Sequence, residues 1–182
     1  MRAVEKRHTS DLGRLSVEAF KSSEKLPLVV VLDSVRSALN VGSVFRTADA
    51  FAVERLVLCG ITACPPHREI NKTALGSTAS VVWSYESDVV RALEQLRAEG
   101  YRLLAIEQAA PSIPLHELII EAGVRYAFIL GNEVSGVSEA ALRCCDGAVE
   151  IPQFGTKHSL NIAVAAGIAV WDFTRRCRLS GQ

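Results

Sequence analysis

Three polar segments in this chain carry asparagine, arginine, glutamate and glycine at spacings that could hold a phosphate or a small ligand. The first is SALNVGSVFRTADAF, residues 37–51, which places Asn40 and Gly42 in a predicted turn and Arg46 early in a predicted helix. A turn that enters a helix presents unpaired N–H groups and partial positive charge, and a guanidinium binds phosphate bidentately. The alternative is a capping asparagine, a turn glycine and a solvated arginine.

The second segment is ILGNEVSGVSEAAL, residues 129–142, in which an apolar run ends at Gly131 and Glu133 follows. A glycine at position 131 would let the backbone approach a ligand closely. A carboxylate at the end of an apolar strand must be paired or hydrated, so Glu133 could pair with Arg46 and orient its guanidinium. The spacing differs from the Gly-x-Gly-x-x-Gly of a dinucleotide site. An ordinary strand–turn–helix connection is the alternative.

The third segment is IPQFGTKHSLNIAVAAGIAVW, residues 151–171, where a polar loop leads into a long apolar helix. Ser159 is predicted as the N-cap of that helix, which is an ordinary structural role. Asn161 is then predicted to lie inside the helix, where asparagine is a poor helix former. An asparagine on a buried helix suggests a specific hydrogen bond.

The elements that position these segments alternate between strands and helices. Strands are predicted at 28–32, 55–59, 79–83, 102–106, 126–130 and 148–151, and helices at 41–51, 87–99, 138–145 and 159–176. This alternation predicts an α/β fold with a mostly parallel six-stranded sheet and helices on both faces. Each polar segment follows a strand, and open α/β sheets bind ligands at the carboxyl ends of their strands.

Length and composition are those of a globular protein. The chain has 182 residues, 49% of them hydrophobic, and equal numbers of basic and acidic residues, 20 of each. We expect one domain over residues 26–182, preceded by a helical extension over residues 1–25. Zero net charge argues weakly against a nucleic-acid partner, because local patches matter more than sums.

Cysteine usage and hydropathy bear on the compartment. The five cysteines form no Cys-x-x-Cys pair and no Cys/His ligand spacing, which indicates reduced thiols and no metal site. The charged N-terminus is unlike a signal peptide, and no apolar run reaches the length of a membrane span. We therefore expect a cytoplasmic protein without a membrane segment.

Taken together and in this order, the three segments resemble the motifs of the SpoU (TrmH-like) branch of the SPOUT RNA methyltransferases. Asn40, Gly42, Arg46 and Phe51 match the first motif, and the second and third segments match the Gly-x-Glu-x-x-Gly and Ile-Pro…Ser-Leu-Asn motifs. KTALGSTASVVW, residues 72–83, resembles a further family segment, so the resemblance covers roughly residues 26–175. Two positions depart from the pattern, Ala52 for a usual glycine and Asn132 for a frequent serine.

The resemblance implies a sheet whose C-terminal part forms a deep trefoil knot, the SPOUT fold. It implies methyl transfer from S-adenosyl-L-methionine to a ribose 2′-hydroxyl of tRNA or rRNA, and the compact chain favours tRNA. Family members are homodimers whose active site is completed across the interface. Val164, Ile168 and Trp171 lie at helical spacing on the apolar C-terminal helix and offer a surface for such a dimer.

The resemblance also assigns roles to single residues. Arg46 is expected to stabilise the developing alkoxide, because a guanidinium stays protonated and makes a poor general base. Asn40 and Asn161 would hold the ribose and Arg46, Glu133 would orient Arg46 or Asn40, and Ser159 would position the cofactor or target. Cofactor contacts are expected from Ile106, Leu130, Gly131, Ile151, Ser159 and Leu160. RNA contacts are expected from Arg46, Arg7, Arg14, Arg68, Lys72, Arg175 and Arg176.

Two other functions remain open at the level of the sequence. A non-catalytic RNA-binding protein of the same fold would not need Asn40, Arg46, Glu133 and Asn161, all of which are present. A dinucleotide-dependent oxidoreductase would need the glycine fingerprint and an acidic ribose-binding residue, and both are missing at the required spacing.

Overall fold

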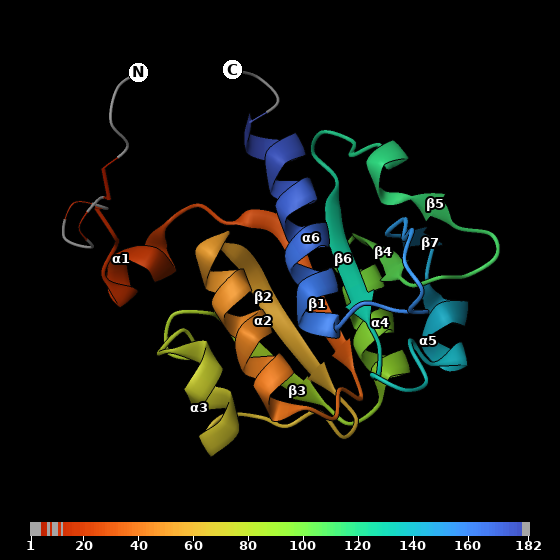
Figure 1. Ribbon diagram of the computed structural model, residues 1–182, viewed down its shortest axis with the longest axis horizontal. Coiled ribbons are helices and arrows are strands. Elements are labelled where there is room, and N and C mark those ends of the chain that lie inside the picture. The colour runs from red at the N-terminus through yellow and green to blue at the C-terminus, as the bar shows by residue number, and fades with distance from the viewer. Residues whose placement is uncertain (1–4, 7, 9–10, 12, 180–182) are drawn as a thin grey trace.

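The computed structural model describes residues 5, 6, 8, 11 and 13–179 of the chain. Within them, seven strands form one sheet in the order β3-β2-β1-β6-β4-β7-β5, and all neighbouring pairs are parallel (Figure 1). The strands are β1 Leu26–Asp33, β2 Val53–Cys59, β3 Trp83–Glu86, β4 Tyr101–Ile106, β5 Ile113–Pro114, β6 Arg125–Leu130 and β7 Gly147–Glu150. The parallel α/β sheet expected from the sequence is confirmed, although six strands were expected and seven are found.

Helices cover both faces of the sheet. Helices α2, α3 and α6 pack on one face, and α4 and α5 pack on the other (Figure 1). Their bounds are α1 Val17–Ser22, α2 Ala38–Ala50, α3 Arg68–Ala74, α4 Val89–Ala98, α5 Glu139–Cys144 and α6 Ile162–Thr174, with a 3₁₀ turn η2 at Leu115–Glu117 and a π-helical turn η3 at Arg175–Leu179. No helix in the described part of the chain is long and apolar enough to cross a membrane.

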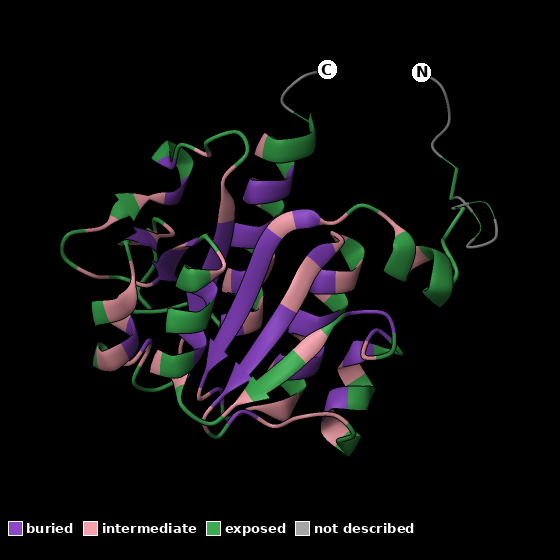
Figure 2. Cartoon of the chain, turned by 180° about the vertical axis from the view of Figure 1, so that it is seen from behind, coloured by how far each residue is buried: buried purple, intermediate pink, exposed green. Residues whose placement is uncertain are grey.

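Strand β1 is apolar from Leu26 to Leu32 because both of its faces are buried. Leu28 and Leu32 belong to the core beneath α2 and α6, whereas Val29 and Val31 belong to the core beneath α4 and α5. Figure 2 shows the central strands as almost continuously buried, with exposed residues concentrated on the outer helix faces. Burying a side chain of this size contributes about 1.5–3 kcal/mol, so this strand anchors both layers.

Helix α6 docks onto the sheet through aromatic rings. The ring of Phe173 makes edge-to-face contacts with Tyr126 and Phe128 of β6, with centroids 5.5 Å apart in both pairs. Edge-to-face pairs contribute about 0.5–1.5 kcal/mol beyond their buried area. These contacts fix the C-terminal half of α6, and thereby the polar loop that precedes the helix.

The differences from the sequence-based expectation include one strand with other bounds and two elements that were not expected. Strand β3 begins at Trp83 rather than spanning 79–83, because residues 77–81 form turns in which the Ser80 hydroxyl donates to Asp49 at 2.5 Å. Helix α3 was not expected, and its seven residues are too short to show a helical period. Strand β5 was also not expected; it has two residues and carries Pro114 at the sheet edge, where proline is tolerated.

The packing of α3 on α2 depends on Gly42. A Cβ atom at this position would lie 2.2 Å from Thr73 Oγ1 and 2.3 Å from the Ile70 carbonyl oxygen. Gly42 therefore lies within α2 rather than in the predicted turn, and its missing side chain lets the two helices touch. Thr73 strengthens the contact by donating to the Leu39 carbonyl at 2.8 Å.

Candidate active site

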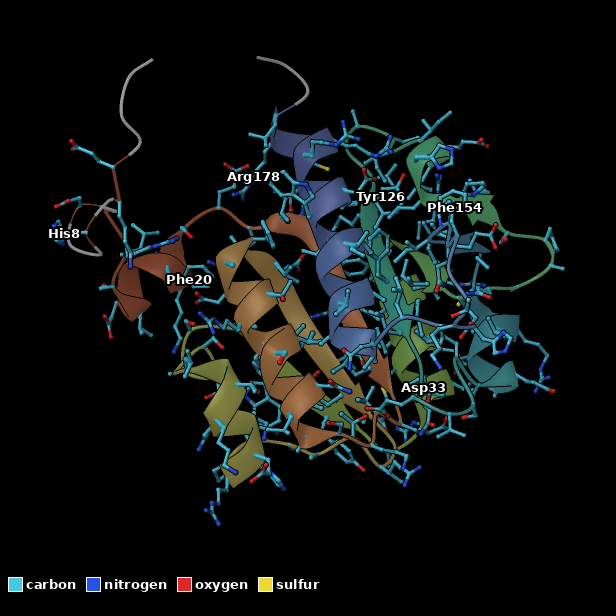
Figure 3. The ribbon with its side chains drawn as sticks, viewed as in Figure 1. His8, Phe20, Asp33, Tyr126, Phe154 and Arg178 are labelled. Atoms are coloured by element: carbon cyan, nitrogen blue, oxygen red, sulfur yellow. The ribbon has the colours of Figure 1, made fainter. Side chains whose placement is uncertain are left out.

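The loops after β4, β6 and β7 meet the start of α6 around a cavity of about 520 Å³. This volume lies in the range of small-molecule sites, which are commonly about 300–1,000 Å³. The cavity opens at the carboxyl edge of the sheet, the edge at which β1 ends in Asp33, labelled in Figure 3. All six residues expected to contact a cofactor line it: Ile106, Leu130, Gly131, Ile151, Ser159 and Leu160.

Glu133, in the loop after β6, binds the start of α2, which follows the neighbouring strand β1. Its carboxylate accepts hydrogen bonds from the backbone N–H groups of Arg36, at 2.8 Å, and Ser37, at 3.0 Å. The Asn40 side-chain amide donates to the same carboxylate at 2.9 Å. The loop after β6 and the turn before α2 are therefore held together by one side chain.

These hydrogen bonds favour the ionised form of Glu133. Partial burial by itself would raise the pKa of this carboxyl. The donors from Arg36, Asn40 and Ser37 outweigh burial and hold the pKa of Glu133 below its usual value. Glu133 is thus an anion at neutral pH, and three N–H groups point at it.

Asn161 extends this network to α6. Its side-chain amide donates to Asn40 Oδ1 at 3.1 Å, and its carbonyl oxygen accepts from the backbone N–H of Ala163 at 2.9 Å. Asn161 is therefore the N-cap of α6. The sequence-based prediction had placed it inside the helix. Ser159, predicted as the N-cap, lies two residues earlier and lines the cavity instead.

Arg46 does not pair with Glu133, contrary to the sequence-based expectation. Helix α2 starts earlier than predicted, because Ser37 is its N-cap and accepts from the Asn40 N–H at 3.3 Å. Arg46 consequently lies in the second half of α2, about 9 Å along the helix axis from Asn40. Its exposed guanidinium makes no hydrogen bond or ion pair with any residue that the structure describes.

Gly131 allows a close approach of the chain to itself, and it also lines the cavity. A Cβ atom there would lie 2.0 Å from the backbone of Gly136 and Val137. The backbone of Asn132 pairs with that of Gly136 through two hydrogen bonds of 2.9 Å, which folds the loop back on itself. The second motif thus builds a compact loop that forms one wall of the cavity.

Glu107 and Gln108 of the cavity wall were not identified from the sequence. Glu107 accepts hydrogen bonds of 2.9 Å from the N–H groups of Gln108 and Val137. Gln108 donates to the His158 carbonyl oxygen at 2.8 Å, which joins the loop after β4 to the loop before α6. The one available signal was their position, since Glu107 and Gln108 directly follow an apolar strand.

An exposed face of α2 and α6 carries Arg46 together with several apolar side chains. The positions of Leu39, Arg46 and Ala50 fall on one side of α2, at helical spacing. On the adjoining helix α6, Val164, Ile168 and Trp171 are 50%, 37% and 46% exposed. The ring of Trp171 touches Phe51 at the end of α2, with centroids 5.7 Å apart, so the two stripes form one surface.

The residues expected to bind RNA lie in several places. Arg7 lies outside the described residues. Arg14 lines a groove of about 1360 Å³ between the N-terminal segment and α2, together with Arg46 and with Phe20 and Arg178, which are labelled in Figure 3. Arg68 and Lys72 lie on α3, and Lys72 joins Arg46 in lining a smaller hollow next to this groove.

Some of these basic residues are bound within the chain. Lys72 pairs with Glu69 at 2.6 Å on the surface of α3. Arg175 and Arg176 both pair with Asp172, at 3.0 Å and 2.5 Å, and Arg176 also donates to the Leu115 carbonyl oxygen. The contacts of Arg176 thus hold η2 against the end of α6.

Comparison with known proteins identifies the family. The model of the SpoU rRNA Methylase family matches residues 27–171. The 23S rRNA (guanosine-2'-O-)-methyltransferase RlmB of Neisseria meningitidis is 29% identical over 153 residues, which are 84% of this chain and 60% of that protein. The chain spans 60%, 64% and 51% of the lengths of three curated bacterial relatives.

Solved structures agree with this result. The crystal structure of an AdoMet-bound rRNA methyltransferase from Sinorhizobium meliloti has a TM-score of 0.78 and 28% identity, and the match covers 88% of this chain and 61% of that chain. A structure described as giving insights into the 2-OH methylation of C/U34 on tRNA has a TM-score of 0.73 and 27% identity. This match covers 86% of this chain and 100% of that chain. The chain belongs to the SpoU rRNA methylase family, as the motifs around Asn40, Glu133 and Asn161 predicted.

Proposed function

We propose that this chain is an S-adenosyl-L-methionine-dependent RNA methyltransferase that methylates a ribose 2′-hydroxyl. The observation that carries the proposal is the Glu133–Asn40–Asn161 hydrogen-bond network at the rim of a ligand-sized cavity. The network joins all three sequence motifs at the edge where parallel sheets bind ligands. Relatives named for 2'-O-methylation of RNA support the same chemistry.

The cavity fits a nucleoside cofactor in shape and chemistry. Ile106, Leu130, Ile151 and Leu160 offer apolar surface for an adenine ring, and Glu107 supplies a carboxylate for a ligand that carries positive charge. When bound, S-adenosyl-L-methionine supplies an electrophilic methyl group on a positively charged sulfur. The protein's part is to hold the ligand, exclude water and position the acceptor hydroxyl.

The network fixes the groups that would meet the ribose. Asn40 donates one amide hydrogen to Glu133 and accepts from Asn161, so its orientation is determined by two partners. Asn161 is fixed in turn by capping α6. Rigid amides at hydrogen-bonding distance place an acceptor hydroxyl without reorganisation, which is the main contribution a protein makes to such a transfer.

Arg46 is the residue that we propose to act on the developing charge. The hydroxyl proton must leave as the oxygen–carbon bond forms, and the oxygen becomes more negative while it does so. A permanently protonated guanidinium stabilises that charge or grips the neighbouring phosphate, and cannot remove the proton itself. The side chain of Arg46 is available for this role, since no described residue binds it.

We propose that the exposed face of α2 and α6 forms a homodimer interface. Arg46 lies on this face and outside the cavity of its own chain. Packing a second copy against Val164, Ile168 and Trp171 would bury apolar surface and bring Arg46 towards the partner. This arrangement accounts for a catalytic arginine that lies apart from the cofactor residues of its own chain.

RNA contacts are proposed along the groove next to Arg46. Arg14 lines this groove, Lys72 lines the hollow beside it, and Arg68 lies on the same helix as Lys72, so that all three could offer positive charge to phosphates. We favour tRNA over rRNA as the substrate, supported by the compact tRNA-related structure whose whole chain is matched. The rRNA relatives make rRNA the alternative substrate.

A trefoil knot in the C-terminal part is proposed from the family resemblance. Strand order supports it, because β6 lies between β1 and β4 while β7 lies beyond β4. The chain then returns across the sheet, where α6 packs against β6 and α2. An experimental structure whose chain tracing leaves residues 151–179 unthreaded would contradict this proposal.

A methylation assay tests the function. Purified protein and radiolabelled S-adenosyl-L-methionine are incubated separately with bulk tRNA and bulk rRNA, and the product is digested to nucleosides. We expect a labelled 2′-O-methylnucleoside from tRNA, and none with Arg46→Ala. Arg46→Lys should keep substantial activity if charge alone matters. Cofactor binding without label in either RNA would favour the non-catalytic RNA-binding alternative.

A further inference from the structure

The cavity wall carries negative charge that no lysine or arginine among its described lining residues offsets. Its lining includes the carboxylates of Glu107 and Glu133 and the imidazole of His158, and no lysine or arginine. Glu133 is bound by the start of α2, where three N–H groups stabilise its charge. Glu107 is the carboxylate whose role the network leaves unexplained.

Glu107 is held rigidly at the wall. One carboxylate oxygen accepts from its neighbour Gln108 and the other accepts from Val137, across the cavity wall in the loop after β6. The backbone of Gly136 makes room for it, because a Cβ atom there would lie 2.3 Å from Glu107 Oε2. Gly136 also has a φ of +70°, a conformation that side chains other than glycine rarely adopt.

A fixed carboxylate without a counterion favours a positively charged ligand. Among the described residues, no arginine, lysine or histidine forms an ion pair with Glu107. A ligand that fills the cavity displaces water from this carboxylate, and removing water from an unpaired charge is costly. A ligand cation nearby offsets that cost, because attraction between opposite charges strengthens where water is excluded.

We propose that Glu107 makes this cavity selective for the cationic methyl donor over its product, which lacks the positive charge on sulfur. S-adenosyl-L-methionine carries one positive charge more than S-adenosyl-L-homocysteine, and the two molecules are otherwise nearly identical in shape. Glu107 therefore favours the donor before transfer and loses that attraction afterwards, which promotes product release. This inference rests on the proposed function, since it concerns the cofactor of that reaction.

A purely structural role for Glu107 predicts something different. If Glu107 only tied two loops together, replacing it would loosen the cavity and lower the affinities for both ligands by the same factor. If its charge selects the donor, replacing it changes the ratio of the two affinities. The ratio of dissociation constants therefore separates the two roles, even where the absolute affinities fall.

The experiment measures both dissociation constants by calorimetry at pH 8. Glu107→Gln removes the charge, and Glu139→Gln removes one from α5, where the side chain is 92% exposed and lies outside the cavity lining. We expect the preference for the donor over the product to fall about tenfold in Glu107→Gln. Glu139→Gln should keep the wild-type ratio.

A second measurement needs no substitution. In the wild-type protein, added salt should weaken binding of the donor more than binding of the product, because screening acts on the net charge. An unchanged ratio in Glu107→Gln together with equal salt dependence of the two ligands would overturn the inference alone. Failure of the wild-type protein to bind either ligand would overturn the proposed function as well.

Discussion

Polar clusters lie at the amino and the carboxyl edges of the sheet, where the strands begin and end. The negative charges are neutralised in different ways at the two edges. At the amino edge, Glu54 binds Arg125 at 2.7 Å and Glu99 pairs with Arg55, so two anions meet two cations. Tyr101 lies between them and donates to Glu54 at 2.6 Å. At the carboxyl edge, the carboxylates of Asp33, Glu107 and Glu133 are bound by N–H groups alone.

Three anions at the carboxyl edge are bound in this way, without a cation. Asp33 accepts from the Ser138 N–H at 2.9 Å, while Glu107 and Glu133 accept from the backbone donors described above. No ion pair joins any of the three to a described cation. A cluster that serves stability is neutralised within the chain, whereas a cluster that serves binding leaves charge for a ligand to meet.

The largest expected effect is on catalysis at the carboxyl edge. Glu133→Gln places an amide NH₂ against N–H donors and releases Asn40 from its fixed orientation. We expect methyl transfer to fall by about 100-fold or more, with a loss of stability of about 1 kcal/mol. Initial rates and urea unfolding measure the two quantities. A variant with normal rates would show that the network does not position the acceptor.

The next effect is on ligand binding. Gly131→Ala forces a Cβ atom into the backbone of Gly136 and Val137, which must displace the loop that forms the cavity wall. We expect cofactor affinity to fall by at least about tenfold. Gly155→Ala is the matched control in the third motif, because its Cβ atom would meet no other atom within 4 Å. Equal affinities for the two variants would contradict this account.

At the amino edge the expected effect is on stability alone. Tyr101 is 3% exposed, and burial, together with the hydrogen bond to Glu54, raises the pKa of its hydroxyl above the usual value. Tyr101→Phe removes the hydroxyl and leaves part of the hydrogen-bonding capacity of Glu54 unused. We expect a loss of about 1–2 kcal/mol in urea unfolding, with an unchanged rate of methyl transfer. A reduced rate with full stability would remove the distinction between the two edges.

The smallest effect concerns acid pH. The pKa of Glu133 is lower in the folded chain than in the unfolded chain, so its ionised form stabilises the fold. That contribution is complete above the unfolded pKa, about 4.3, and is lost as the pH falls through the lower folded pKa. Between pH 5 and pH 3, the wild-type protein should lose more stability than Glu133→Gln. Identical slopes for the two proteins would show that the carboxylate gains nothing from its donors.

The sequence predicted those features that depend on local pattern. The apolar run in β1 requires burial on both faces, and the alternation of strands with helices requires a parallel sheet. The need of Glu133 for a partner also followed from its place after an apolar strand. The choice of that partner did not, because Arg46 and Asn40 lie on the same helix and only its starting residue decides between them.

Other features depend on contacts between distant segments. Asn161 was expected inside α6 because nothing local distinguishes the first turn of an apolar helix from the residue before it. Gly42 looked like a turn glycine, whereas its role is to admit α3, an element too short to be foreseen. Nothing in the local sequence distinguishes Glu107 from other polar residues, because its fixed position depends on the space that Gly136 leaves for it.

The attachment of Glu133 to the backbone before α2 has a consequence for local opening. The N–H groups of Arg36 and Ser37 exchange their hydrogens with solvent only when the loop after β6 moves away from them. A ligand that immobilises this loop should therefore slow amide exchange at the start of α2 without touching the helix. Binding of a ligand in the cavity would then protect amides at the start of α2, the helix that carries Arg46, against hydrogen exchange.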